Sequence, residues 1–402
     1  NPDWSPAALR SAMMTSAYQD VVQQDGETPA NPFDFGAGHL RPNGAGKPGL
    51  LFDAGADDYD AFGCGLEEPI PDPARCDELA AAGASFDAAQ FNQASIAIEQ
   101  LTGRRSITRT VTATGDTAAT WQVDIEPPPG TVVSVSPATL SLNPGESATY
   151  TVELEFVGAG LDLWYFGAVT WRGGETAVRT PVAIRPVSLS APEEVRDAGG
   201  SGSLGFDVEF GYTGSYSAGV HGLNEALVID GFVANDPTKT FTFRDGNGVT
   251  THVIDVPPNQ AYLRFALFDE ATDGDDDLDM YVYYCPNDIC SRIGESGSET
   301  SEEEYSLVTP PAGRYAVLIH GFETDQVAGG PGANYQLFAW AVGLVDDAGN
   351  MTVSAPASVS AGSTETLQVS WSGLAADRRY LGAVSHVTPN GLIALTIVNI
   401  RN

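Results

Sequence analysis

Hydrophobic and polar residues follow a clear helical pattern near the start of the chain and a weak one at residues 77–89. Ser5 and Pro6 precede a run rich in alanine, leucine and methionine, in which Leu9 and Met13 are four residues apart. Serine is a favoured N-cap residue, and proline is tolerated at the first helical position because its missing N–H would have no partner there. The pattern predicts a helix from Pro6 to about Ala17, with Leu9 and Met13 on one face.

From Ser106 onward the pattern changes to a period of two, which is typical of β-strands. Turn-forming residues separate the apolar runs, for example at 127–130 and 143–145. The expected strands of this block are 106–112, 119–125, 131–136, 147–156, 164–172 and 176–185. Their spacing predicts a β-sandwich of roughly 90 residues.

A stretch rich in glycine, serine and acidic residues, 188–202, predicts a linker. Strand-like runs that predict a second sandwich follow it at 204–210, 238–244, 250–255, 261–268, 278–284 and 314–320. Residues 356–384 then repeat the outline of residues 137–169, which indicates a third, smaller β-domain. Turn residues that unrelated β-domains share are the alternative explanation of this repeat.

Acidic residues greatly outnumber basic ones. The chain has 19 Lys and Arg against 53 Asp and Glu, a net charge of −34. Because this charge repels phosphate backbones, we expect no nucleic acid partner. No run of about 18 apolar residues occurs, the nearest being the short stretch 337–345, and a membrane span is therefore not expected.

The four cysteines form two local pairs, Cys64 with Cys76 and Cys285 with Cys290. Neither pair has the Cys-x-x-Cys spacing that favours zinc or redox chemistry. The pattern predicts two short-loop disulfides, and disulfides persist in oxidising compartments. Four free thiols in a cytosolic protein are the alternative.

Residues 269–279 hold six aspartates and one glutamate directly before an expected strand. Carboxylate oxygens are the ligands that calcium prefers, and carboxylates this close together repel one another unless a cation is nearby. We take calcium as the candidate cofactor and Asp275, Asp277 and Asp279 as its ligands. The alternative is an acidic loop that only contacts solvent.

Five tryptophans lie on predicted strands, where alternating aromatic residues mostly fill sandwich cores. An exposed face that binds a sugar polymer or collagen is the alternative. The five are Trp121, Trp164, Trp171, Trp340 and Trp371.

Two motifs near the start carry a family resemblance. Residues 1–17, NPDWSPAALRSAMMTSA, resemble the helix that follows the nucleophile helix in subtilisin-like serine proteases. Residues 31–40, NPFDFGAGHL, and 48–53, PGLLFD, resemble the closing segment of the same catalytic domain. The two motifs occur in the order and spacing of that family.

The resemblance extends into the β-rich part. Residues 106–137 look like the fibronectin type III-like domain of long subtilisin-like proteases. Residues 204–345 resemble the bacterial pre-peptidase C-terminal β-sandwich, through the runs 262–265, 277–282 and 313–317.

These features predict a mainly β fold, in which tandem β-sandwich domains follow a short α/β remnant of a subtilisin-like catalytic domain. A small domain of immunoglobulin or fibronectin type is expected at the end. The expected divisions are the catalytic-domain segment 1–60, an acidic linker with a weak helix 61–100, and three β-domains at 101–187, 188–345 and 346–402.

The resemblance implies a secreted serine endopeptidase whose Ser-His-Asp triad lies upstream of Asn1. Its protein or peptide substrate would bind through that missing catalytic part. No Gly-Thr-Ser-Met-Ala run or Gly-x-Ser-x-Gly elbow occurs in the chain. Structural or surface roles are therefore expected for the five histidines, and this chain alone is predicted to be inactive. The alternative is a non-enzymatic, secreted β-sandwich binding module. The five histidines are His39, His221, His252, His320 and His386.

Overall fold

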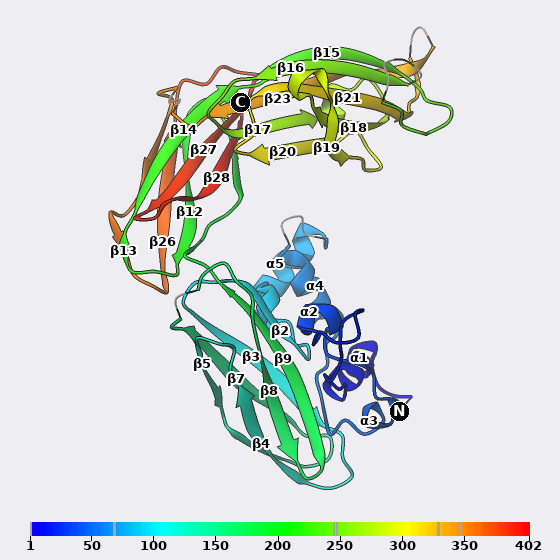
Figure 1. Cartoon of the computed structure of the whole chain (residues 1–402), viewed down its shortest axis with the longest axis vertical. Helices are drawn as coiled ribbons and strands as arrows, with labels where there is room; N and C mark the ends of the chain where they lie inside the picture. The colour runs from blue at the N-terminus through cyan, green and yellow to red at the C-terminus, as the bar shows by residue number, and fades with distance from the viewer. Residues whose placement is uncertain are drawn as a thin grey trace. The chain divides into compact units, whose positions relative to one another are not determined.

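The chain folds into two compact units, both dominated by β-strands as the sequence predicts (Figure 1). The computed structural model describes residues 2–66, 70–158, 160–243, 246, 248–327, 330–345 and 348–402. Unit 1 contains residues 1–190, 209–213 and 360–363, and unit 2 contains residues 191–208, 214–359 and 364–402.

Unit 1 begins with a capped helix, α1 (Pro6–Thr15). The Ser5 hydroxyl accepts a hydrogen bond from the backbone N–H of Ala8 at 2.9 Å, as expected for an N-cap. The helix ends two residues before the expected Ala17. There the hydroxyl of Ser16 donates to the Ala12 carbonyl, and such side-chain bonds compete with continuation of the helix.

Only one face of α1 is buried in unit 1. Ala8 and Ala12 pack with Leu51 of β1 (Leu50–Leu51), and Trp4 lies against them. Leu9 and Met13, on another face, stay 44% and 45% exposed. The helix therefore carries apolar surface that unit 1 does not cover.

The β-sandwich of unit 1 pairs a four-stranded sheet, β1-β3-β7-β5, with a five-stranded sheet, β2-β9-β8-β4-β6. Each of the six expected strands is present. The short strands β2 and β6 were not expected, because six and four residues give too little alternation to stand out. The strands are β2 (Ile96–Leu101), β3 (Arg104–Ala113), β4 (Ala119–Glu126), β5 (Thr131–Ser136), β6 (Thr139–Leu142), β7 (Ser147–Phe156), β8 (Tyr165–Gly173) and β9 (Thr176–Pro186), with the two-residue β10 (Leu189–Ser190) after them.

The segment expected as an acidic linker, 61–100, is folded in the structure wherever it is described. The disulfide between Cys64 and Cys76 joins α4 to α5, and the Arg75 guanidinium contacts Asp57 and Asp60 of α4 at 2.5 and 3.0 Å. Acidic composition alone suggested a linker. In the structure the disulfide and the ion pairs of Arg75 hold the two helices together. The remaining helices of the unit are α2 (Pro32–Phe35), α3 (Pro42–Ala45), α4 (Ala56–Cys64), α5 (Pro73–Ala81) and the 3-10 turn η1 (Ala88–Gln90).

Unit 2 contains two sandwiches. The first, here called the inserted sandwich, packs a sheet β15-β23-β17-β20 against a sheet β16-β21-β18-β19, and the short β22 pairs with β23. The expected strand at 238–244 is absent from its described residues 238–243. The strands are β15 (Leu227–Ala234), β16 (Val249–Val256), β17 (Gln260–Leu267), β18 (Asp277–Tyr284), β19 (Ser291–Ser296), β20 (Glu303–Val308), β21 (Gly313–Glu323), β22 (Gln326–Val327) and β23 (Gly330–Gly343), with 3-10 turns η2 (Asp269–Ala271) and η3 (Pro286–Asp288).

The second, here called the flanking sandwich, is built from strands on both sides of the inserted one. Its sheets are β12-β26-β24 and β11-β28-β27-β14, with a small pair β13-β25. The strands are β11 (Glu194–Ala198), β12 (Gly202–Phe210), β13 (Gly214–Ser215), β14 (Ser217–Glu225), β24 (Met351–Ser354), β25 (Ser358–Val359), β26 (Ser363–Trp371), β27 (Arg379–Thr388) and β28 (Gly391–Arg401).

This arrangement differs from the expected divisions at 188 and 346. Glu194 to Ala198, inside the expected linker, run parallel to Ile397–Arg401, and β14 pairs with β27. The expected third domain, 346–402, is therefore only part of a sandwich whose other strands precede residue 226. No local pattern signals a partner strand about 200 residues away, because alternation reports a strand and not its neighbour.

The two sandwiches of unit 2 share apolar contacts. Phe338 and Trp340 of β23 pack in one cluster with Leu381 of β27 and Ile397 of β28. Of the five tryptophans, only Trp164 is half-buried, and the other four are buried. This burial favours the core role over an exposed binding face.

Candidate functional site

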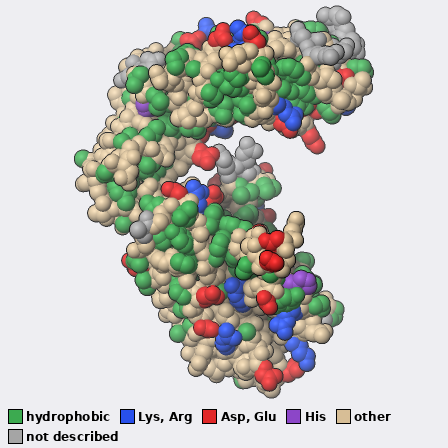
Figure 2. Space-filling view, in the orientation of Figure 1, with side chains coloured by type: hydrophobic (Ala, Val, Ile, Leu, Met, Phe, Trp, Pro, Cys, Tyr) green, Lys and Arg blue, Asp and Glu red, His purple; other side chains and the backbone are tan. Residues whose placement is uncertain are grey.

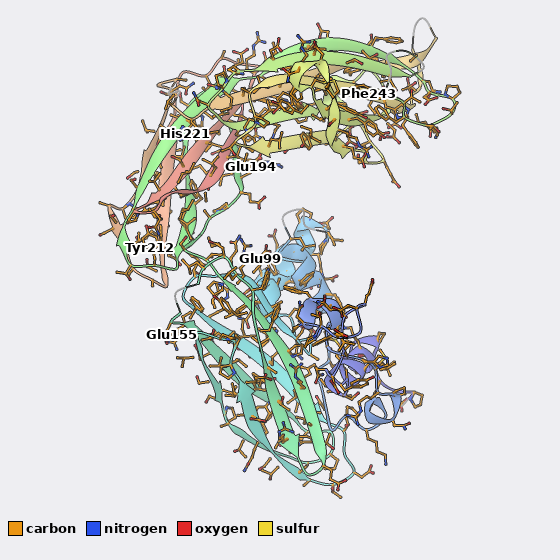
Figure 3. All side chains as sticks on the ribbon, viewed as in Figure 1. Glu99, Glu155, Glu194, Tyr212, His221 and Phe243 are labelled. Carbon is orange, nitrogen blue, oxygen red and sulfur yellow. A yellow bond between two sulfur atoms is a disulfide. The ribbon has the colours of Figure 1, made fainter. Side chains whose placement is uncertain are left out.

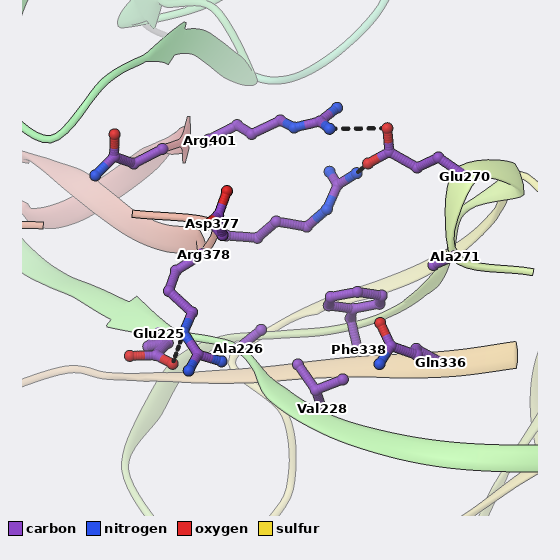
Figure 4. Close-up of a pocket in the computed structure, with 12 residues that line it drawn as sticks. Glu225, Ala226, Val228, Glu270, Ala271, Gln336, Phe338, Asp377, Arg378 and Arg401 are labelled. Atoms are coloured by element: carbon purple, nitrogen blue, oxygen red, sulfur yellow. Dashed lines mark hydrogen bonds and ion pairs between the residues drawn. The ribbon is translucent and has the colours of Figure 1, made fainter. Parts of the chain in front are cut away.

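A cavity of about 460 Å³ lies in unit 2, lined by residues of both sandwiches (Figure 4). Elsewhere, on the face that Figure 2 shows, basic side chains stand in small separate groups with acidic neighbours. The cavity differs because three of the chain's 19 basic residues, Arg378, Arg379 and Arg401, line it together. Phe338 and Val228 supply apolar surface.

Strand register brings two of these arginines together. Arg379 at the start of β27 is the direct cross-strand partner of Arg401 at the end of β28. Like charges directly opposite one another destabilise an antiparallel pair. The structure offsets this repulsion with Glu270 of η2, whose Oε1 contacts Nη2 of Arg379 and whose Oε2 contacts Nη2 of Arg401 at 2.8 Å.

Aromatic rings fix the position of the Arg379 guanidinium. Its Cζ lies 3.6 Å from the centroid of the Phe268 ring and 5.6 Å from that of Phe338. Cations are attracted to the face of such rings, more strongly where water is excluded. Burial raises and the two guanidiniums lower the pKa of Glu270, and the net shift is downward.

The third arginine has its own partner. Nε of Arg378 lies 3.3 Å from Oε1 of Glu225, at the end of β14. Asp377, next in sequence, also lines the cavity. Arginines and carboxylates therefore balance locally, in a chain that carries a large negative charge elsewhere.

A smaller cavity of about 240 Å³ shares Arg379 and Arg401 with the first. Below it, Nη2 of Arg264 forms a buried ion pair with Oε2 of Glu194 at 2.6 Å. Glu194, which Figure 3 labels, comes from β11 and Arg264 comes from β17, so the pair joins the two sandwiches. Burial raises and Arg264 lowers the pKa of Glu194, with a net downward shift.

Comparisons with known proteins give a family match and several relatives. Residues 90–184 match the family model described as a fibronectin type-III domain. The chain is 35% identical over 214 residues to the subtilisin-like protease SBT3.11 of Arabidopsis thaliana, which covers 47% of this chain and 26% of that protein. It is also 35% identical over 205 residues to the subtilisin-like protease SBT3 of Solanum lycopersicum, covering 46% and 27%.

Over about half its length, the chain is similar to subtilisin-like proteases. It spans about a quarter of the length of these relatives. Among solved structures, tripeptidyl peptidase 2 covers 88% of this chain and 25% of its own at 12% identity, with a TM-score of 0.26. The secreted serine protease VesC from Vibrio cholerae covers 62% and 49% at 10% identity, with a TM-score of 0.21, and scores this low carry no argument.

The matched fibronectin type-III domain begins earlier than the expected residue 101. A buried side chain holds this earlier segment: the Arg109 guanidinium of β3 donates to the carbonyls of Ala89 at 2.9 Å, Ser95 at 3.0 Å and Gln93 at 3.2 Å. Burial lowers the pKa of Arg109 to about 10. The guanidinium therefore holds η1 and the residues just before β2 against the sandwich, through hydrogen bonds to their backbone carbonyls.

The predicted calcium ligands do not converge in the structure. Asp275 is exposed, Asp277 opens β18, and Asp279 points its Oδ2 at His320 Nδ1. Within the described ranges, no three acidic, histidine or cysteine side chains form a metal-binding group. Calcium binding by Asp275, Asp277 and Asp279 therefore stays a prediction.

Two neighbouring carboxylate oxygens in this loop are nevertheless buried without a hydrogen-bond partner, Oδ2 of Asp276 and Oδ1 of Asp277. Burial and nearby carboxylates raise the pKa of both side chains. Such oxygens are costly to bury unless something compensates them.

His320 of β21 lies between two carboxylates. Its Nε2 is 3.0 Å from Asp236 Oδ2 and its Nδ1 is 3.1 Å from Asp279 Oδ2, and the residue is 1% exposed. Burial lowers the pKa of His320, but the hydrogen bonds to Asp279 and Asp236 raise it by a larger amount, so the net shift is upward. The hydrogen bond from His320 also lowers the pKa of Asp236.

Three of the other histidines contact a backbone carbonyl or the hydroxyls of tyrosine and threonine. His39 Nδ1 contacts the Leu40 carbonyl, and His252 Nε2 lies 2.8 Å from the Tyr335 hydroxyl. His386 lies between Tyr216 Oη at 2.6 Å and Thr396 Oγ1 at 2.9 Å. Such contacts hold the three imidazoles in fixed positions in the fold.

Both predicted cysteine pairs are disulfides in the structure. Cys64–Cys76 lies in unit 1 and Cys285–Cys290 in the inserted sandwich. None of the helices in the described part is long and apolar enough to cross a membrane.

Sequence reasoning missed the arginine-lined cavity. The adjacent Arg378 and Arg379 in an acidic chain were a usable signal, but nothing local placed Arg401 beside them. That proximity follows only from the β27–β28 register and from Glu270 of the inserted sandwich.

Proposed function

We propose that this chain is the C-terminal part of a secreted serine endopeptidase of the subtilisin-like type. The similarity to subtilisin-like proteases over about half the chain carries the proposal. In the whole enzyme a serine acyl-enzyme would hydrolyse peptide bonds of a protein or peptide substrate. The two disulfides support an oxidising, extracellular compartment.

The surface of α1 supports the same proposal. Leu9 and Met13 lie four residues apart on a ten-residue helix and remain exposed. Helical segments this short gain most of their stability from packing an apolar face against the rest of a domain. The missing part of a catalytic domain would supply that packing, and Leu9 and Met13 would then be buried.

The chain by itself is proposed to lack catalytic activity. The recorded partners of His320 are carboxylates, and those of His386 are hydroxyls of tyrosine and threonine. A serine nucleophile needs an adjacent base that a third group orients. That constellation would lie outside these 402 residues.

Two measurements test the proposal. The first treats the purified chain with a serine-directed fluorophosphonate and with a denatured protein substrate, and we expect neither labelling nor cleavage. A labelled serine would show that the chain has its own active site. The second reads the coding DNA upstream of Asn1, where a frame encoding Gly-Thr-Ser-Met-Ala within about 25 codons is expected.

A non-enzymatic binding module is the second candidate, and the arginine-lined cavity favours it for unit 2. The two roles are compatible, because an accessory sandwich can bind a ligand while unit 1 completes a catalytic domain. An unrelated signal peptide directly upstream of Asn1 would favour the binding module alone.

A further inference from the structure

We propose that the cavity lined by Arg378, Arg379 and Arg401 binds a small organic monocarboxylate with an apolar body. The carboxylate would lie against the paired guanidiniums of Arg379 and Arg401. The apolar body would lie against Phe338 and Val228. This site does not depend on the protease assignment, since every residue involved belongs to unit 2.

Charge excludes a polyanion as the ligand. The net charge of −34 repels polyanions, although at physiological ionic strength charges more than about 8 Å away are largely screened. Near the cavity three guanidiniums and three carboxylates balance, so the remaining N–H groups of the guanidiniums, and not net charge, select an acceptor. The carboxylates of Glu225, Glu270 and Asp377 disfavour a second negative charge on the ligand.

The guanidiniums are held in place before a ligand arrives. Register sets Arg379 opposite Arg401, and the Phe268 ring lies 3.6 Å from the Arg379 Cζ. The recorded ion pairs engage Nη2 of each, so the other guanidinium nitrogens keep N–H groups for a further acceptor. Because the donors are already ordered, binding loses less conformational entropy.

The chain shows which anion these arginines accept. Glu270 places one oxygen on each guanidinium, which is the bridging contact that a planar carboxylate makes. A ligand carboxylate would use the remaining donors or displace Glu270. The volume of about 460 Å³ suits a drug-sized molecule, which binds in cavities lined partly by aromatic side chains.

Calorimetric titration of the full chain with 3-phenylpropionate and with 3-phenylpropionamide tests the proposal. The two probes differ only at the carboxylate. We expect the acid to bind with a Kd of about 1 mM or below, and at least about tenfold more tightly than the amide. Equal binding of acid and amide, or no heat from the acid at about 10 mM, would overturn the proposal.

A second pair of probes distinguishes a peptide C-terminus from a free organic acid as the natural ligand. The probes are Gly-Gly-Phe with a free C-terminus and the same peptide with a C-terminal amide. If only the free peptide binds more tightly than 3-phenylpropionate, the natural ligand is a peptide C-terminus. If the peptide binds less tightly, it is a free organic acid. Either result supports the carboxylate site.

Three variants locate the binding. Arg401→Gln removes a guanidinium whose side chain is 61% exposed, so the fold should persist, and we expect about tenfold weaker binding of the acid. Glu270→Gln removes the competing carboxylate, and we expect binding to tighten several-fold. Arg292→Gln is the matched control, because its side chain is 51% exposed and its ion pair with Glu295 lies on β19, away from the cavity.

The directions of these changes distinguish a ligand site from a purely structural clamp. A clamp predicts that Arg401→Gln and Glu270→Gln lower thermal stability alike and leave 3-phenylpropionate binding unchanged. A ligand site predicts opposite changes in affinity. If Arg401→Gln and Arg292→Gln weaken binding equally, the cavity is not the site.

Discussion

Two buried histidines in unit 2 have opposite environments. His320 in the inserted sandwich contacts two carboxylates, Asp236 and Asp279, whereas His386 in the flanking sandwich contacts the hydroxyls of Tyr216 and Thr396. Both are buried almost completely. The pKa of His320 is raised, and burial lowers the pKa of His386 to about 4.

The difference shows that burial alone does not decide the charge of an imidazole. Ionised carboxylates only accept hydrogen bonds, so the contacts of His320 with Asp236 and Asp279 favour the imidazolium, in which both ring nitrogens donate. Hydroxyls both donate and accept, so His386 is satisfied as a neutral ring. The inserted sandwich therefore contains a buried ion group, and the flanking sandwich contains a buried neutral one.

The largest expected effect comes from removing one of the carboxylates. Asp236→Asn leaves a buried imidazolium with one anionic partner, and it weakens the contacts of Asp236 with Thr238 and Thr240. We expect the free energy of unfolding of the inserted sandwich to fall by about 3–5 kcal/mol, measured by urea denaturation at pH 6. Asp255→Asn, an exposed carboxylate 3.7 Å from Arg314, is the control and should change little. A loss below about 1 kcal/mol for Asp236→Asn would mean that the ion group contributes little.

Lowering the pH should change the contributions of the two histidines to stability in opposite directions. The folded pKa of His386 lies below its unfolded value of about 6.5, so its stabilising contribution is lost as pH falls from about 6.5 to about 4, up to about 3 kcal/mol in all. The folded pKa of His320 is raised, so its contribution is complete below about 6.5 and is lost as pH rises through the folded value.

Imidazole NMR signals measure this directly. We expect the His386 resonances to titrate near pH 4 and those of His320 to stay in the imidazolium position beyond pH 6.5. The charges of Asp279 and Asp236 favour the charged form of His320. If both histidines titrated together near pH 6.5, the contrast between a charged His320 and a neutral His386 would be wrong.

A smaller effect is expected from replacing the neutral histidine itself. His386→Phe keeps the ring volume but removes the contact of 2.6 Å between the imidazole and the Tyr216 hydroxyl, while Thr396 retains its bond to the Pro192 carbonyl. We expect a loss of about 1–2 kcal/mol at pH 7, and this variant should lack the acid-side loss of stability. If it costs as much as Asp236→Asn, the neutral group is as important as the ionic one.

The smallest effect is expected from calcium. If Asp275, Asp277 and Asp279 bind it with a Kd of about 0.5 mM, 1 mM calcium should stabilise the inserted sandwich by about 0.7 kcal/mol and leave the flanking sandwich unchanged. Thermal unfolding with and without calcium measures this, with magnesium as the control ion. No shift at about 5 mM calcium would dismiss the site.

The sequence predicted what depends on local pattern. The N-cap at Ser5, the six strands of the unit 1 sandwich and the two cysteine pairs all follow from neighbouring residues or short spacings. It did not predict that Glu194 to Ala198 pair with Ile397–Arg401, because strand partners are chosen by packing between distant segments.

The same limit explains the candidate sites. The density of carboxylates in residues 269–279 suggested Asp275, Asp277 and Asp279 as ligands, but only the last two lie on β18, and Asp279 contacts His320. Asp236, the partner of His320, follows β15, and Glu270, the partner of Arg401, lies in η2, so both come from elements far away in sequence. A site assembled from several elements becomes visible only when register is known.

The pairing of β11 with β28 also dictates an order of events during synthesis. The four-stranded sheet of the flanking sandwich has β28 as an interior strand, so the sheet cannot close until residues near 400 have left the ribosome. The inserted sandwich is complete well before then and can fold first, since domains generally form as units during translation. Strands β11 to β14 cannot pair with β27 and β28 until the whole inserted sandwich has been synthesised. Closing the flanking sandwich therefore depends on non-local contacts and is the slower step.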